Sequence, residues 1–101
     1  MRTAAKVDAN QPEIVSQLRD IPGCTVLIMS MLGKGAPDFV IGWMGANYLI
    51  ELKDGEKVPS KRRLTRDEKR FHRQWGGQID IAESFEDCLE IIGVSTERAQ
   101  F

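Results

Sequence analysis

The first regular pattern along the chain is a stripe of apolar residues at helical spacing. The stripe consists of Ile14, Val15, Leu18 and Ile21. Its spacing predicts a helix over about 11–20, which ends at Pro22-Gly23. Asn10 and Glu13, three residues apart, have the form of a capping box at the start of this helix.

Three apolar segments rich in β-branched or aromatic residues follow, and each predicts a strand. These segments are Cys24–Ser30, Asp38–Met44 and Tyr48–Lys53. The glycine-rich sequence LGKGAP (32–37) predicts a loop between the first two strands. Gly45-Ala46-Asn47 predicts a tight hairpin connection between the last two.

The C-terminal part predicts two further helices around a short fourth strand over 78–82. Thr65 and Glu68 form a capping box that opens a helix over about 66–75, and Ser84 caps a last helix over 85–92. The resulting order is α-β-β-β-α-β-α. A three-stranded meander followed by a helical crossover predicts an α/β fold with a mixed four-stranded sheet and helices packed on it.

Length and composition place this pattern in one globular domain. The 101 residues are 42% hydrophobic and 29% charged, and domains commonly hold about 100–150 residues. We expect a single domain over 1–101, with a core over about 8–93 and a tail over 94–101. The longest apolar run is too short for a membrane span, and no signal peptide is recognised. The expectation is therefore a soluble cytoplasmic protein with no membrane partner.

The net charge of −1 hides a strong asymmetry. Nine Lys or Arg against four acids lie between Lys53 and Arg73, which gives that segment +5 and the rest of the chain −6. A concentrated basic stretch on a weakly acidic body indicates a polyanion that binds to one face. A solvated loop and an exposed helix face would give the same pattern.

Glu51 and Lys53 form an unusual pair at the end of an apolar strand. Strand alternation places both side chains on one face, about 6.6 Å apart. An acid and a base at the end of an apolar strand lower the stability of the fold unless they pair or take part in the function. A solvated ion pair on an edge strand is the alternative. Asp38 opens the neighbouring strand, directly after Pro37; its alternative role is that of a turn residue.

The hairpin brings Asp38 to the Lys53 end of the third strand. A two-residue connection at Gly45-Ala46 places Asp38 opposite Lys53, whereas a three-residue connection places Phe39 there. In either register two carboxylates and an ammonium converge at one end of the sheet. Two carboxylates so placed repel each other unless a hard cation such as Mg²⁺ lies between them.

Together these residues resemble the signature of PD-(D/E)XK nucleases, with P37-D38, a 12-residue spacer and E51-L52-K53. The wider pattern is similar to a minimal stand-alone VRR-NUC domain of the phage and bacterial kind. It comprises DANQPEI, GKGAPD, IELKDG, PSKRRLTRDE and FHRQWGG, and it covers about residues 8–92. The resemblance implies a restriction-endonuclease-like core.

The resemblance also implies a metal site that uses Mg²⁺, with Mn²⁺ as a substitute. Asp38 and Glu51 would be ligands together with the backbone carbonyl of Leu52. Lys53 would orient or help deprotonate the attacking water and offset charge in the transition state. Glu13 matches an acidic residue on the family's first helix and could reach the metal, beside its role in the capping box. Asp38, Glu51 and Lys53 are the catalytic candidates.

Basic residues near this site are candidates for phosphate contacts, which position DNA without reading its sequence. They are Lys34, Lys57, Lys61, Arg62, Arg63, Lys69, Arg70 and Arg73. For Lys34 the alternative is an exposed loop lysine. Where many relatives have Gln, this chain has Glu68, whose role could be restricted to capping its helix.

The sequence therefore predicts a metal-dependent endonuclease that hydrolyses DNA phosphodiester bonds, and the resemblance implies selectivity for branched DNA such as a Holliday junction. A less selective phage endonuclease, a non-catalytic DNA-binding module and a small interaction domain are the alternatives. Two symmetric nicks in a four-way junction favour a homodimer with two sites. Trp43 and Met44 are the interface candidates, unless both pack inside the monomer.

Overall fold

The computed structural model describes residues 8–94. In chain order its elements are α1 (Gln11–Arg19), β1 (Thr25–Ile28), the 3₁₀ helix η1 (Ser30–Leu32), β2 (Phe39–Trp43), β3 (Ala46–Leu52), the 3₁₀ helix η2 (Pro59–Lys61), α2 (Arg66–Gln74), β4 (Asp80–Ala82) and α3 (Phe85–Ile92). The four strands form one sheet in the order β1-β2-β3-β4. The first three pair antiparallel and β4 pairs parallel to β3, which confirms the predicted mixed sheet.

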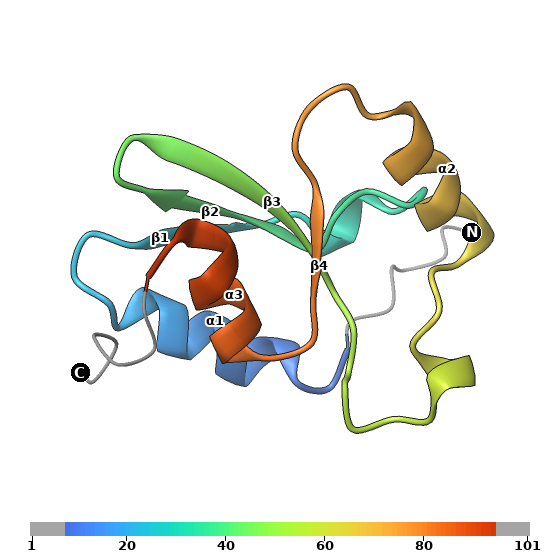
Figure 1. Cartoon of the computed structure of the whole chain (residues 1–101), viewed down its shortest axis with the longest axis horizontal. Helices are drawn as coiled ribbons and strands as arrows, with labels where there is room; N and C mark the ends of the chain where they lie inside the picture. The colour runs from blue at the N-terminus through green and yellow to red at the C-terminus, as the bar shows by residue number, and fades with distance from the viewer. Residues whose placement is uncertain (1–7, 95–101) are drawn as a thin grey trace.

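The helices cover the two faces of the sheet unequally. Helices α1 and α3 pack on one face, while α2 lies apart from them beyond β4 (Figure 1). The core lies between the sheet and the α1–α3 layer, where Leu18, Phe39, Ile50 and Leu89 are almost completely buried. The opposite face of the sheet is only partly covered. Strand side chains that point to this face lie outside the core, so they can contribute to a functional site.

Two of the three predicted helix starts are confirmed. Thr65 and Glu68 form the complete capping box of α2, and the Ser84 side chain accepts a hydrogen bond from the Asp87 N–H at the start of α3. The predicted box of Asn10 and Glu13 is wrong, because the Asn10 side chain makes no capping bond. Its amide instead donates to the carbonyl oxygen of Lys53, at 3.4 Å.

The hairpin between β2 and β3 differs from both predicted registers. Trp43 pairs with Ala46, so the two turn residues are Met44 and Gly45. Both have a positive φ, which is 51° for Met44 and 81° for Gly45. Both central residues of a type I′ turn need this conformation, which Gly45 adopts without strain. Phe39 pairs with Ile50, and Asp38 therefore comes next to Glu51 instead of Lys53.

Strand β3 is an inner strand of the sheet, between β2 and β4. The alternative of a solvated ion pair on an edge strand is therefore wrong for Glu51 and Lys53. At the other end of the chain, Val94 packs against the core, and residues 95–101 of the expected tail lie outside the described part. Among the helices of residues 8–94, none is both long and apolar enough to cross a lipid bilayer.

Candidate active site

Asp38, Glu51 and Lys53 meet at one end of the sheet. All three are buried, with exposed fractions of 7%, 1% and 8%. They line a hollow of about 230 Å³. Its complete lining is Asp8, Asp38, Glu51, Lys53, Lys57, Lys61, Arg63, Thr65 and Glu68. Burial of several ionisable groups is costly unless they are paired or bind a ligand, and within residues 8–94 the buried side chains of the charged residue types are those of Asp38, Glu51 and Lys53.

The backbone of β3 fixes the Asp38 carboxylate. The Asp38 N–H donates to the carbonyl oxygen of Ile50 at 3.0 Å, and Asp38 Oδ2 accepts from the Leu52 N–H at 2.7 Å. The N–H and C=O of one strand residue point to the same side. The Leu52 carbonyl therefore faces the side of β3 on which Asp38 lies, as expected for the third oxygen ligand of the resemblance.

Lys53 is held between two carboxyl groups. Its Nζ lies 2.7 Å from Glu68 Oε1 and 3.7 Å from Glu51 Oε2. Glu68 Oε1 also accepts from the Thr65 N–H at 2.8 Å, so one oxygen caps α2 and binds Lys53. The role of Glu68 is therefore wider than capping its own helix.

The glycine loop before Asp38 (32–37) supports the contact between Lys53 and Glu68 by packing against α2. Gly35 has a φ of 82°, and a Cβ at this position would overlap the backbone of Asp67 and lie 2.8 Å from the Glu68 nitrogen. The loop thus packs directly on the first turn of α2, which only a residue without a side chain allows. This packing holds Glu68 next to Lys53.

Burial and mutual repulsion set the charge states of the acids. Burial, with the charges of Asp38 and Glu68, raises the pKa of Glu51 to about 10. Burial also raises the pKa of Asp38, against the hydrogen bond from Leu52. Glu51 is therefore protonated at neutral pH in the metal-free protein. Its 3.7 Å contact with Lys53 joins a neutral carboxyl to an ammonium, and the charge partner of Lys53 is Glu68.

Lys53 and Glu68 shift each other's pKa in opposite directions. Burial alone would lower the pKa of Lys53, but the hydrogen bond and charge of Glu68 outweigh it and raise the pKa. Burial would likewise raise the pKa of Glu68, but the hydrogen bonds from Lys53 and Thr65 lower it. Both groups are therefore charged at neutral pH, and the site keeps one fixed cation at its centre.

The acids fit a divalent cation. Glu51 Oε1 is buried and accepts no hydrogen bond from the described residues, so it is available to bind a ligand. A cation beside it would also relieve the repulsion between Glu51 and Asp38. Residues 8–94 contain no preformed cluster of three or more Asp, Glu, His or Cys side chains that could hold a metal ion, but Mg²⁺ needs only one or two carboxylates beside water and phosphate oxygens.

Asp8 lines the hollow, although the sequence did not identify it. Burial raises the pKa of Asp8, and the charges of Lys53 and Lys57 oppose the shift. Glu13, the acid expected from the first helix, is exposed on α1 and does not line the hollow. Asp8 is the first residue of the DANQPEI segment of the resemblance, which was a signal for it, but no role followed from that segment because only the packing of the chain before α1 brings Asp8 into the hollow with Lys53.

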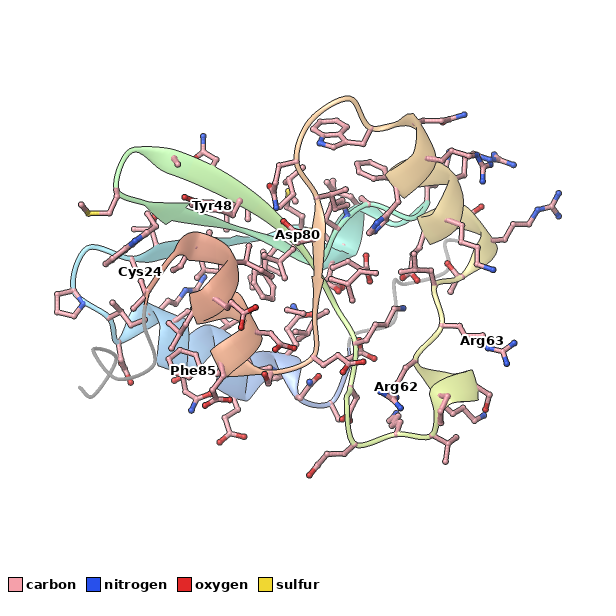
Figure 2. The ribbon with its side chains drawn as sticks, viewed as in Figure 1. Cys24, Tyr48, Arg62, Arg63, Asp80 and Phe85 are labelled. Atoms are coloured by element: carbon pink, nitrogen blue, oxygen red, sulfur yellow. The ribbon has the colours of Figure 1, made fainter. Side chains whose placement is uncertain are left out.

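The basic candidates separate into three groups. Lys57, Lys61 and Arg63 line the hollow. Arg62 instead pairs with Glu83, at 3.1 Å, and the two neighbouring arginines point in different directions (Figure 2). The others are exposed, namely Lys34 in the glycine loop and Lys69, Arg70 and Arg73 on α2.

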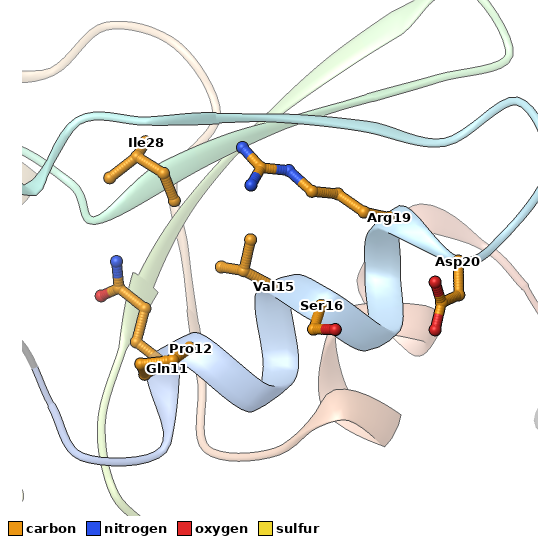
Figure 3. A pocket seen from close by; sticks show the side chains of 7 residues that line it. All are labelled: Gln11, Pro12, Val15, Ser16, Arg19, Asp20 and Ile28. Carbon is orange, nitrogen blue, oxygen red and sulfur yellow. The ribbon is translucent and has the colours of Figure 1, made fainter.

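A larger hollow of about 430 Å³ lies elsewhere, between α1 and β1 (Figure 3). It is lined by Gln11, Pro12, Val15, Ser16, Arg19, Asp20 and Ile28. Arg19 crosses it and donates to the Val26 carbonyl at 3.0 Å. None of the predicted site residues lines it, and it has a single carboxylate. Size is therefore a poor guide here, because Asp38, Glu51 and Lys53 line the smaller hollow.

Comparison with known proteins agrees with this fold. No family model matches the sequence, and no curated protein matches it. A solved structure described as a VRR_NUC domain is similar, with a TM-score of 0.51 and 26% sequence identity over 82% of this chain and 89% of the other. This likeness confirms the resemblance found in the sequence: the chain has the fold of a VRR-NUC nuclease domain.

Proposed function

We propose that the protein is a metal-dependent endonuclease that hydrolyses phosphodiester bonds in DNA. The observation that carries the proposal is the buried pair of Asp38 and Glu51 beside Lys53, in a hollow whose rim is basic. A structural ion pair would not need a second buried acid with an unsatisfied oxygen. Acids at the bottom and cations at the rim match the charge distribution of a metal-bound phosphodiester.

The metal ligands of this proposal are the Asp38 and Glu51 carboxylates and the Leu52 carbonyl. Asp8 is a further acid within the hollow. The chemistry supplied by bound Mg²⁺, or by Mn²⁺ in its place, is Lewis-acid polarisation of the scissile phosphate. The metal would also favour the ionised form of Glu51, because an opposite charge lowers the pKa of a carboxyl.

The position and the positive charge of Lys53 suit it to bind the reacting phosphate. Its ammonium is fixed by Glu68 at 2.7 Å and can donate further hydrogen bonds to a phosphoryl oxygen or to the attacking water. In the reaction water attacks the phosphorus in line, the opposite P–O bond breaks, and a phosphate monoester and a hydroxyl end result. Lys53 stabilises the negative charge that develops on the phosphoryl oxygens.

The basic residues support binding of a polyanion. Lys57, Lys61 and Arg63 belong to the wall of the hollow, so they would contact phosphates next to the scissile one. Lys69, Arg70 and Arg73 on α2 extend the positive surface. Such contacts supply affinity and orientation but no sequence readout.

Branched DNA as the substrate and a homodimer as the active form are the finer parts of the proposal. The described chain carries one acidic hollow of this kind, whereas resolution of a four-way junction needs two symmetric nicks. Met44 is 83% exposed at the hairpin tip and remains an interface candidate. Trp43 packs partly against the core, so its place in the interface loses support.

A cleavage panel of duplex, flap, fork and four-way junction, with Mg²⁺ or Mn²⁺, tests the proposal. We expect metal-dependent nicking by the wild type, loss of nicking by Glu51→Gln, and unchanged nicking by Glu13→Gln, whose side chain is exposed on α1. Binding without cleavage under all metal conditions would support a non-catalytic DNA-binding module instead. Equal cleavage of all four substrates would leave an endonuclease without structure selectivity.

A further inference from the structure

A second groove lies on the same face of the sheet as the candidate active site. It has a volume of about 270 Å³ and is lined by Val40, Asn47, Leu49, Trp75, Gly77 and Gln78. Pockets that enclose drug-sized ligands commonly measure about 300–1,000 Å³, so this groove suits one flat ring system. Its walls are apolar, with two side-chain amides at the edges.

Strand alternation makes the groove a direct neighbour of the acidic hollow. Leu49 and Glu51 are two residues apart on β3, so their side chains lie on the same face, about 6.6 Å from each other along the strand. Val40 is the cross-strand partner of Leu49 and widens the apolar floor. A nucleotide next to the scissile phosphate can therefore reach the groove.

Trp75 forms one wall of the groove and is held in a fixed orientation. Its ring stacks on Phe71 with a centroid distance of 5.2 Å and an interplanar angle of 17°. The indole N–H donates to the Gln78 carbonyl at 3.2 Å, and Gly77 approaches so closely that a Cβ there would lie 3.0 Å from Trp75 Nε1. Although fixed on these sides, Trp75 is 46% exposed.

The Gln78 side chain fixes the groove to the sheet. Its amide donates to the Leu49 carbonyl at 2.9 Å and accepts from the Leu49 N–H at 2.7 Å. These two hydrogen bonds extend the backbone hydrogen-bond ladder of β3 through the Gln78 side chain. The segment after α2 therefore holds Trp75 at a defined place beside the strand that also carries Glu51.

We infer that this groove is a subsite for an unpaired nucleobase of the DNA substrate, which stacks on Trp75. Aromatic side chains in basic grooves bind successive bases of single strands in this way, with little sequence preference. The lining of the groove itself carries no charged side chain; the nearest cations along the chain are Lys69, Arg70 and Arg73 on the preceding helix α2, so stacking on Trp75 and not charge is the contact that the groove supplies. The inference rests on the proposed function, because it assumes that the adjacent hollow binds a DNA phosphate.

The subsite would make the enzyme sensitive to DNA structure. In continuous duplex each base is paired and stacked on its neighbours, and it must leave the stack to enter the groove. A base at a branch point, flap or frayed end is already free. The groove therefore stabilises complexes in which an unpaired base lies next to the cleavage site.

Fluorescence of the metal-free protein tests the subsite independently of catalysis. The chain has two tryptophans, so the Trp43→Phe variant leaves Trp75 as the single reporter. We expect a short oligo-dT to quench Trp75 emission, and an abasic oligonucleotide of equal length and charge to quench it much less. Equal quenching by both would overturn the inference, because phosphate contacts alone would then explain the signal.

Affinity measured by anisotropy of a labelled oligo-dT gives the second readout. Trp75→Leu should weaken binding by about 5- to 150-fold, the range that corresponds to the loss of one stacked base. Trp75→Tyr should restore most of it, and Leu27→Ser, a change at another exposed apolar side chain, should have no effect. Circular dichroism checks that each variant is folded.

The remaining outcomes separate this inference from the proposed function. If Trp75 emission responds to protein concentration and not to oligonucleotide, a second copy covers the groove and the subsite is excluded. If Trp75→Leu leaves binding of oligo-dT unchanged while the wild type cleaves DNA, the subsite is excluded and the nuclease stands. If the wild type shows base-dependent quenching but no cleavage with any metal, the nuclease fails and the groove is a single-strand binding site.

Discussion

Lys53 Nζ and Glu68 Oε1 are 2.7 Å apart, and this contact joins the centre of the candidate active site to the first turn of α2. Glu68 also completes the capping box with Thr65. The helix that carries Lys69, Arg70 and Arg73 is therefore fixed to the lysine next to the acidic pair. Movement of α2 on DNA binding would be transmitted directly to Lys53.

The first prediction separates the two roles of Glu68. Glu68→Ala removes the partner of Lys53 as well as half of the capping box, whereas Thr65→Ala removes only capping. Both variants should lose stability, by about 1 kcal/mol for the cap, but only Glu68→Ala should lower the cleavage rate by more than tenfold. Glu68→Gln keeps a hydrogen-bond acceptor and should retain more activity. Thermal unfolding and single-turnover cleavage measure the two effects; equal rates in Glu68→Ala and Thr65→Ala would contradict the positioning role.

The second prediction concerns Glu51 and pH in the absence of metal. Folding raises the pKa of Glu51 from 4.5 to about 10, so the folded state holds a proton that the unfolded state releases above pH 4.5. The stability contribution of this group is complete below pH 4.5 and is lost as the pH rises towards 10. Glu51→Gln, a neutral mimic, should therefore raise the free energy of unfolding at pH 8 by on the order of 1–3 kcal/mol, and by little at pH 4.

Urea denaturation in EDTA at the two pH values measures this difference. Glu13→Gln is the matched control, because the Glu13 side chain is exposed. A Glu51→Gln variant that is less stable than the wild type at pH 8 would show that Glu51 is ionised and well paired in the folded protein.

The third prediction tests the metal ligands by thermal shift. A ligand that binds only the folded state stabilises it by about 2.7 kcal/mol at 100 times its dissociation constant. Saturating Mg²⁺ or Mn²⁺ should therefore raise the melting temperature of the wild type and of Glu13→Gln. The rise should be much smaller for Asp38→Asn, and EDTA should reverse it. An equal shift in Asp38→Asn and wild type would remove Asp38 from the metal site.

The fourth prediction uses two glycines of one loop. Gly33 and Gly35 both have positive φ, of 68° and 82°, but a Cβ has no neighbour within 4 Å at Gly33 and overlaps the Asp67 backbone at Gly35. Both alanine variants carry the backbone strain, and only Gly35→Ala also displaces α2. Gly35→Ala should therefore lose more stability and more cleavage activity. If the two variants behave alike, packing of the loop on α2 does not support the site.

The fifth prediction compares adjacent arginines. Arg63 lines the hollow, whereas Arg62 pairs with Glu83. Arg63→Ala should weaken DNA binding and reduce the slope of log affinity against log salt by about 1. Arg62→Ala should leave the slope unchanged. The comparison requires titrations at several salt concentrations, and the reverse result would assign the phosphate contact to Arg62.

The sequence by itself determined the local features of this protein. The spans of α1, α2 and α3 followed from apolar spacing and from caps such as Thr65 with Glu68, which act within one helical turn. Alternation along β3 correctly placed Leu52 on the core side and Glu51 with Lys53 on the other. These signals are readable because the interacting residues are close in the chain.

Only the tertiary structure decided which residues share the site. The hairpin register depended on the turn at Met44-Gly45, and a shift of the pairing by one or two residues changes which side chain faces Glu51. Asp8 lines the hollow and Glu13 does not, although Glu13 was the acidic residue expected on the first predicted helix. Such contacts join segments far apart in the chain, and they are set by the packing of whole helices and loops, for which the sequence carries no local signal.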